Sequence, residues 1–172
     1  MKAVLISIQP KWCELIASGK KTIEVRKTRP KIKTPFKCYI YCTIGNGAKG
    51  DYLVPSGIQC GKVIGEFVCG KVFDIQFTKP FLYYGKKMFH SNNCCKEACL
   101  SYVELEDYLG SKDGYGWHIS DLTIYDKAKS IEMFPVGKIA RDCGCGGYMI
   151  YNKVLARPPQ SWCYVEELEV EE

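Results

Sequence analysis

The sequence predicts a mainly β protein with a few flanking helices, folded as a small barrel or roll. Three observations favour this class. Many short segments rich in β-branched and aromatic residues alternate with Gly and Pro. Only two segments show helical periodicity, and no repeated βαβ pattern is present. A length of 172 residues with 47% hydrophobic content suits one domain with a real core. We therefore expect a single domain over 1–172, ending in an acidic tail.

The N-terminal half supplies the clearest elements. A short β-branched run before a proline predicts a buried strand, and proline is well tolerated at the first position of the helix that follows. Glycine favours the left-handed conformation that ends helices. The expected order is a strand at 3–8, a helix from Pro10 to Gly19, a strand at 21–27, a basic loop at 28–35 and a strand at 36–44.

The C-terminal half is less regular. Glycine-rich and polar stretches predict loops, while alternating apolar residues predict strands. In order, we expect a loop at 45–61, two strands with a bend near Gly70 within 63–77, an irregular segment at 78–97, a short helix at 100–109, strands at 117–125 and 129–136, a Gly/Cys-rich loop at 138–152 and a last strand at 162–168.

Positive charge is concentrated at the N-terminus. The chain carries a net charge of +5, yet residues 1–37 hold ten Lys or Arg against two Glu. The remainder is therefore net negative. Such asymmetry favours a polyanionic partner for the basic part, although a solvated charged face would give the same composition.

The composition favours a cytoplasmic protein. The apolar run at 3–8 is too short for a secretory signal, and no stretch approaches the roughly 20 apolar residues of a membrane span. Eleven cysteines without a signal indicate free thiols rather than a disulfide framework. A zinc site is a weak alternative, in which thiolates would come from Cys94, Cys95, Cys99, Cys143 and Cys145. We predict no cofactor and no metal.

The string from Gly19 to Arg26 carries the strongest functional signal, with the pattern G-x-K-x-x-E-x-R. Glu24 and Arg26 are two apart, so a strand directs both to one side, and the turn after the helix can bring Lys21 toward them. Arginine offers a planar fork and lysine a point charge for phosphate. The alternative is an edge strand with a surface ion pair that contributes about 0–1 kcal/mol.

These residues resemble the signature of the ASCH domain family. Gly19, Lys21, Glu24 and Arg26 match the motif, and the strand-Pro-helix segment before it is similar to the family's approach to that motif. Weaker similarities follow in order at Val63-Ile-Gly-Glu66, Gly116-Trp-His-Ile119 and Arg157-Pro-Pro-Gln-Ser-Trp162, the last resembling bacterial and prophage-type members.

The resemblance implies a PUA-like barrel with a cleft beside the motif that binds RNA or a nucleotide. It also implies an alternative, because some small members are amidohydrolases acting on acylated cytidine and others are reported as ribonucleases. In the amidohydrolases a Thr stands where this chain has Glu24, while the catalytic Lys would be Lys21. The catalytic Glu would lie near the middle helix, where Glu104 and Glu106 are the candidates. We favour binding without catalysis.

The expected nucleic-acid site includes further cations and one aromatic ring. We assign to it Lys20, Lys21, Glu24, Arg26, Lys27, Trp117 and Arg157, with the loop at 29–37 guiding the polyanion. Trp117 could stack on a base, although a core tryptophan fits the same pattern. His90 and His118 show no nucleophile partner. A protein partner is possible, and the sequence does not define the oligomeric state.

Overall fold

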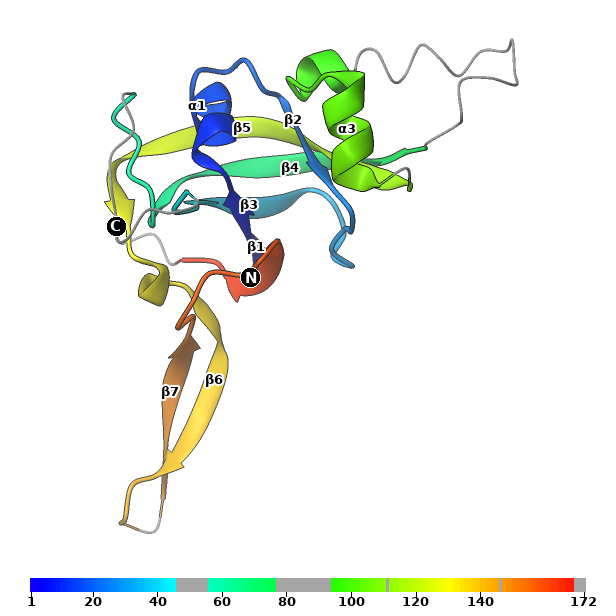
Figure 1. Ribbon diagram of the computed structural model, residues 1–172. Helices are drawn as coiled ribbons and strands as arrows, with labels where there is room; N and C mark the ends of the chain where they lie inside the picture. The colour runs from blue at the N-terminus through cyan, green and yellow to red at the C-terminus, as the bar shows by residue number, and fades with distance from the viewer. Residues whose placement is uncertain (46–55, 77–93, 111, 146, 169–172) are drawn as a thin grey trace.

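The computed structural model describes residues 1–45, 56–76, 94–110, 112–145 and 147–168 (Figure 1). Most of the predicted loop at 45–61, the segment 77–93 with His90, and the end of the acidic tail lie outside these residues. No helix in the described parts of the chain is long and apolar enough to cross a bilayer.

Six strands form one curled mixed sheet in the order β2-β5-β4-β3-β1-β8. Only the pair β1–β3 is parallel, and the other neighbours are antiparallel. Their bounds are β1 Lys2–Ile8, β2 Ile23–Arg26, β3 Phe36–Cys42, β4 Val63–Ile75, β5 Gly114–Lys129 and β8 Trp162–Glu166. The mainly β class is confirmed, with a sheet that is not closed into a complete barrel.

Side chains and one amide bridge the gap between the two edges of this sheet. We call that gap, between β2 on one side and β1 and β8 on the other, the seam. Arg26 Nη2 of β2 donates to the Ser7 carbonyl of β1 at 2.6 Å. Trp162 Nε1 donates to Thr28 Oγ1 at 3.0 Å, and the Lys31 amide donates to the Tyr164 hydroxyl at 2.7 Å. Polar contacts therefore take the place of a strand ladder at this one position.

Two apolar clusters follow from the alternation of β3. Cys38, Ile40 and Cys42 pack with Ile16 of α1 (Pro10–Ala17). Tyr39 and Tyr41, which point to the opposite side, join a second cluster. This period of two is the one predicted from the sequence, and it places α1 over one side of the sheet.

Helix α3 (Tyr102–Leu109) covers β2 from outside. It begins at Ser101, which forms a capping box with Glu104, and ends at Gly110 with φ +67°. Leu105 and Leu109 then pack against Ile23 and Val25 in a third cluster. Strand β2 is consequently buried on both faces.

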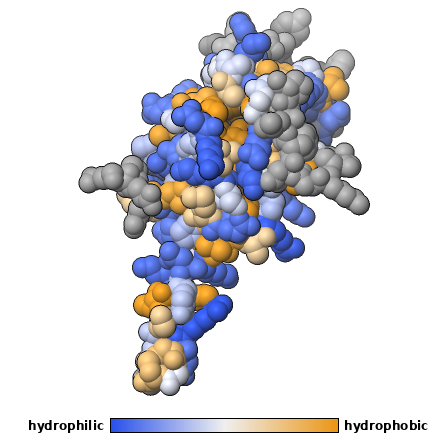
Figure 2. Space-filling view, turned by 90° about the vertical axis from the view of Figure 1, so that its left-hand side faces the viewer, coloured by the Kyte–Doolittle hydropathy of each residue, from blue (hydrophilic) through white to orange (hydrophobic). Residues whose placement is uncertain are grey.

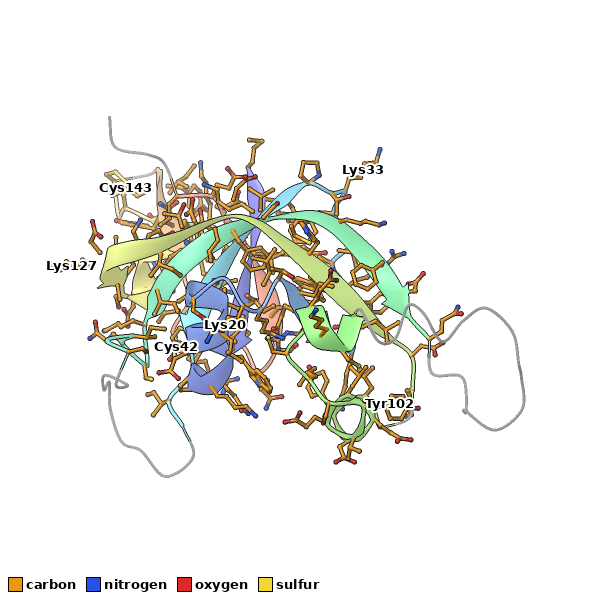
Figure 3. All side chains as sticks on the ribbon, turned by 90° about the horizontal axis from the view of Figure 1, so that it is seen from above. Lys20, Lys33, Cys42, Tyr102, Lys127 and Cys143 are labelled. Carbon is orange, nitrogen blue, oxygen red and sulfur yellow. A yellow bond between two sulfur atoms is a disulfide. The ribbon has the colours of Figure 1, made fainter. Side chains whose placement is uncertain are left out.

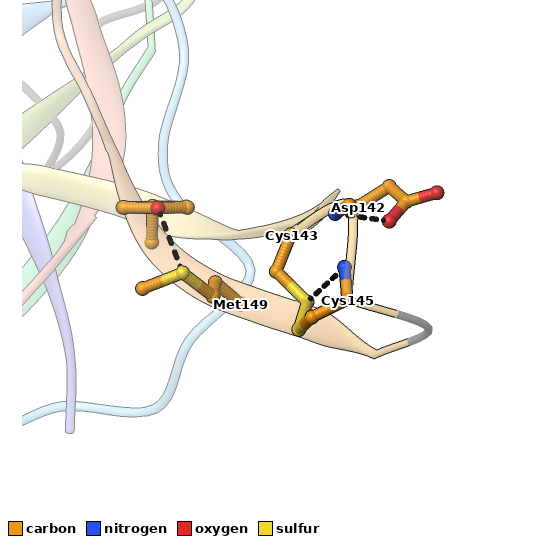
Figure 4. The surroundings of a disulfide bond; sticks show 6 residues. Asp142, Cys143, Cys145 and Met149 are labelled. Atoms are coloured by element: carbon orange, nitrogen blue, oxygen red, sulfur yellow. Dashed lines mark hydrogen bonds between the residues drawn. A yellow bond between two sulfur atoms is a disulfide. The ribbon is translucent and has the colours of Figure 1, made fainter.

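The prediction for 129–152 is wrong in part. In place of a strand to 136 and a loop, β5 runs to Lys129, a 3-10 turn η1 spans Ile131–Met133, and a two-stranded hairpin follows with β6 Pro135–Asp142 and β7 Tyr148–Val154. The glycines and cysteines that indicated a loop occupy only its tip. There Cys143 and Cys145 form a disulfide, and Asp142 Oδ1 accepts from the Gly144 amide at 2.8 Å (Figure 4).

Strand β4 also differs from the prediction, since it continues past Gly70. The expected break is present only as a shift in its register with β5 between Cys69 and Val72. A bulge of this kind bends a strand without ending it.

Candidate ligand-binding site at the seam

The turn after α1 brings Lys21 into the interior. Gly19 adopts φ +70°, and the amides of Lys20 and Lys21 both donate to the Leu15 carbonyl, at 2.9 and 3.0 Å. The chain thus folds back over the helix end before β2 begins. A side chain that the sequence alone places at a strand entrance becomes 3% exposed.

Lys21, Glu24 and Arg26 form one connected cluster, which we call the ion triad. Lys21 Nζ lies 3.4 Å from Glu24 Oε2, and Arg26 Nη2 lies 2.9 Å from Glu24 Oε1. Glu24 is 6% exposed and Arg26 7% exposed. The convergence predicted from the motif is confirmed, and the alternative of a solvated surface pair is wrong, because all three side chains are buried.

Neighbouring elements hold both cations. Lys21 Nζ donates to the Ala98 carbonyl at 2.7 Å and lies 5.1 Å from the centre of the Trp12 ring. Arg26 donates to the Ser7 carbonyl and, at 3.4 Å, to Ser161 Oγ. Contacts from α1, β1 and the segment before β8 therefore fix the triad across the seam.

The charges and donors of the triad are not balanced. Two cations surround one carboxylate, which leaves one positive charge in excess. Arg26 Nε is buried and has no hydrogen-bond partner among the described residues. A buried donor without a partner costs about 1–3 kcal/mol, and a buried charge without compensation costs more. An anion reaching the guanidinium would satisfy both.

The open hollow of this region lies beside the basic loop. It has a volume of about 770 Å³ and is lined by residues 29–34 together with Val72. Arg29, Lys31 and Lys33 contribute its cations, and all three are exposed. Figure 3 shows Lys33 projecting outward, well away from Lys20 near α1. The triad itself does not line this hollow, so the cleft predicted beside the motif is displaced toward the loop.

The remaining predicted site residues differ in position. Lys20 and Lys27 are exposed next to the triad, and Arg157 is exposed before β8. Trp117 is paired with Glu24 across β2 and β5 but is fully buried, with its ring 5.8 Å from Phe36 and 5.9 Å from Trp162. A ring enclosed in this way offers no face to a base, so Trp117 has the core role that was its alternative.

Three contributors were missed from the sequence. Ser7 and Ser161 lie more than 150 residues apart, and no local pattern connects them. Tyr108 lies on α3, where Lys27 Nζ sits 5.4 Å from the centre of its ring. Burial raises the pKa of the Tyr108 hydroxyl, and the adjacent Arg26 guanidinium partly offsets that rise. In the sequence, the spacing of Tyr108 one helical turn after the buried Leu105 is the only feature that indicates its place beside β2.

The cysteines proposed as zinc ligands are not gathered into one place. Cys143 and Cys145 are bonded to each other at the hairpin tip, whereas Cys94, Cys95 and Cys99 lie near α3, at the other end of the molecule (Figure 1). Within the described residues, no group of three or more potential ligands is placed to hold a metal ion.

The fold and the triad define a class of protein with a curled mixed sheet and a buried cationic motif at its seam. The chain belongs to the ASCH domain family, whose model matches residues 6–111. The structure is similar to crystal structures of an ASCH protein from Zymomonas mobilis, with a TM-score of 0.61, 19% identity, and coverage of 96% of this chain and 88% of that one.

Two mutants of the Zymomonas protein give the same result. Its serine-to-alanine mutant has a TM-score of 0.61 at 18% identity, covering 96% of this chain and 89% of that one. Its tyrosine-to-phenylalanine mutant has the same TM-score at 19% identity, with 97% and 92% coverage. At identities this low, the structural similarity shows a shared fold and nothing further. No curated protein matches the sequence.

Proposed function

We propose that the chain is an RNA- or nucleotide-binding module that takes a phosphate at the seam. The observation that carries this proposal is the ion triad, with its excess positive charge and the unpartnered Nε of Arg26. Arginine is suited to phosphate because its donors are planar and fixed. The phosphate would complete a cluster whose other members are already held in place.

The surface around the seam supports a polyanion longer than one phosphate. Lys27 lies over the Tyr108 ring, and Arg29 Cζ lies 5.4 Å from the centre of the Tyr115 ring. Cations next to aromatic rings suit single-stranded RNA, because phosphates meet the charges and bases stack on the rings. The hollow at 29–34 extends this surface.

The test is binding of a fluorescein-labelled single-stranded RNA, followed by anisotropy. Lys31→Ala/Lys33→Ala removes two cations from the hollow and leaves the triad intact. Lys112→Ala/Lys127→Ala is the matched control, since it removes the same charge from exposed positions elsewhere. We expect roughly tenfold weaker binding for the first variant and little change for the second. Equal affinity of the two variants would contradict a polyanion path that runs from the seam over the hollow.

Catalysis is the second candidate, and one contact favours it. Lys21 Nζ and Glu24 Oε2 lie 3.4 Å apart in a buried place, an arrangement that can move a proton. Purified protein incubated with N4-acetylcytidine or labelled RNA would release product if the chain is a hydrolase. Loss of that product in Lys21→Arg, with RNA binding retained, would assign the reaction to Lys21.

A further inference from the structure

The β6–β7 hairpin projects from the body of the protein as an isolated arm (Figure 1). Its strands pair with each other and, within the described residues, with no third strand. It meets the body of the protein at η1 and β8. A two-stranded ribbon by itself is marginally stable in water, so an arm of this length is expected to gain stability from a partner.

The arm is unusually apolar for a surface feature. Ile150 is 69% exposed, and orange and tan hydrophobic patches lie among blue ones on the arm in the space-filling view (Figure 2). The exposed large side chains of β7 are Tyr148, Met149, Ile150, Tyr151 and Val154. They occupy both faces of the ribbon, since successive residues of a strand alternate. Contiguous exposed apolar residues indicate an interaction site.

The two outer edges of the arm are protected to different degrees. Edge strands avoid unwanted pairing through charges, prolines and bulges. Strand β6 has all three, because it contains Lys138, Arg141 and Asp142 and its register shifts between Pro135 and Gly137. Over residues 148–152, β7 contains no charged residue and no proline. The unprotected edge is therefore that of β7.

The sequence of β7 is complementary to itself. In an antiparallel pair of identical strands with the twofold axis at Ile150, that residue faces its own copy, and Met149 faces Tyr151 of the second copy. Tyr148 then faces Asn152. Sulfur–aromatic and apolar cross-strand pairs are stabilising. Lys153 falls opposite Gly147, before β7 begins, so no like charges meet. An axis at Tyr151 would instead place Met149 opposite Lys153.

We propose that β7 pairs antiparallel with β7 of a second copy of this chain, with the twofold axis at Ile150. The product is a four-stranded sheet in the order β6-β7-β7-β6. Pairing of this kind is closed, because both unprotected edges are consumed and only the protected β6 edges remain outside. The proposal does not depend on the function of the seam.

Sedimentation velocity of the wild-type chain is the first test. Between about 1 and 100 µM we expect a concentration-dependent shift from monomer to dimer and no larger species. In hydrogen exchange, which needs no variant, the amides of 148–152 should gain protection as the protein concentration rises. A monomer throughout, or growth beyond a dimer, overturns the proposal.

Charge variants at the axis test the register. Ile150→Lys and Ile150→Glu each place like charges opposite each other, so each variant alone should be monomeric. An equimolar mixture should dimerise, because lysine then faces glutamate. Val103→Lys is the matched control at a residue of α3 that is 64% exposed, and it should behave as wild type. Circular dichroism checks that each variant is folded. A dimer in either variant alone, or no dimer in the mixture, overturns the assigned axis.

Discussion

The ion triad at the seam and the arm formed by β6 and β7 depart from the usual distribution of residues in opposite ways. The triad consists of three buried charged side chains, and neighbouring elements hold its two cations. The arm exposes large apolar side chains that no other described element covers. Both arrangements cost stability in the free chain. We infer that each marks a surface to be completed, by an anion at the seam and by an apolar strand at the arm.

The largest effect is expected at Glu24. Glu24→Gln leaves two cations buried without their carboxylate, so we expect a loss of about 3–5 kcal/mol in the free energy of unfolding. Urea denaturation measures this loss. Glu97→Gln, which changes an exposed carboxylate nearby, is the control and should change stability by no more than about 0.5 kcal/mol. Similar midpoints for the two variants would show that the triad is not a coupled unit.

Tyr108 tests whether the aromatic surface beside the triad takes part in binding. Tyr108→Ala should weaken binding of single-stranded RNA by about 1–3 kcal/mol through lost stacking. Tyr102→Ala is well matched, because Tyr102 lies on the same helix and is 41% exposed against 39% for Tyr108. Anisotropy titrations measure the RNA affinity of both variants. An equal loss of affinity in both would show a general effect on α3 and contradict a specific role of Tyr108.

A smaller effect is expected at Ser7, whose hydroxyl donates to the Pro159 carbonyl at 2.6 Å. Ser7→Ala should lower the free energy of unfolding by about 1 kcal/mol, because the Pro159 carbonyl before β8 loses its donor. Ser18→Ala is the control, since its hydroxyl bonds only within the end of α1. If both substitutions lower the free energy of unfolding equally, the hydrogen bond between β1 and the segment before β8 contributes no more than a local bond at a helix end.

The smallest effect is the pH dependence of stability at Glu66, a residue of β4 outside both the triad and the arm. Burial alone would raise the pKa of Glu66, but the Tyr125 hydroxyl and the Lys37 ammonium outweigh it and lower that pKa. A lowered carboxyl pKa stabilises the fold above the unfolded value of about 4.3, and this contribution is lost as pH falls through the folded value. Melting temperatures from pH 3 to 7 should therefore depend less on pH in Glu66→Gln. An unchanged profile would contradict this role.

Local patterns predicted the part of the fold that local chemistry determines. The Pro10 start and Gly19 end of α1, the alternation of β3 and the short helix near 100–109 all depend on near neighbours in sequence. The same reasoning predicted that Glu24 and Arg26 share one side of β2. Its failure at 138–152 has a clear cause, because glycine and cysteine at the tip concealed the strand residues of β6 and β7 on either side.

Burial and distant contacts could not be predicted in this way. Whether Lys21 is enclosed depends on the Ala98 carbonyl, 77 positions along the chain, and the fixing of Arg26 depends on Ser161. The core position of Trp117 likewise depends on Phe36 and Trp162. The curl of the whole sheet decides these contacts, and no short window of sequence contains them.

The salt dependence of RNA affinity tests the seam most directly. For single-stranded RNA, the logarithm of the association constant should fall with the logarithm of salt concentration by roughly 0.7 per phosphate contact. We expect a steep slope for the wild-type chain and a slope shallower by about 1.4 for Lys31→Ala/Lys33→Ala, with Lys112→Ala/Lys127→Ala matching wild type. A wild-type affinity that is indifferent to salt would contradict an anion-binding seam, and equal slopes in all three proteins would contradict binding of the polyanion along the adjoining hollow.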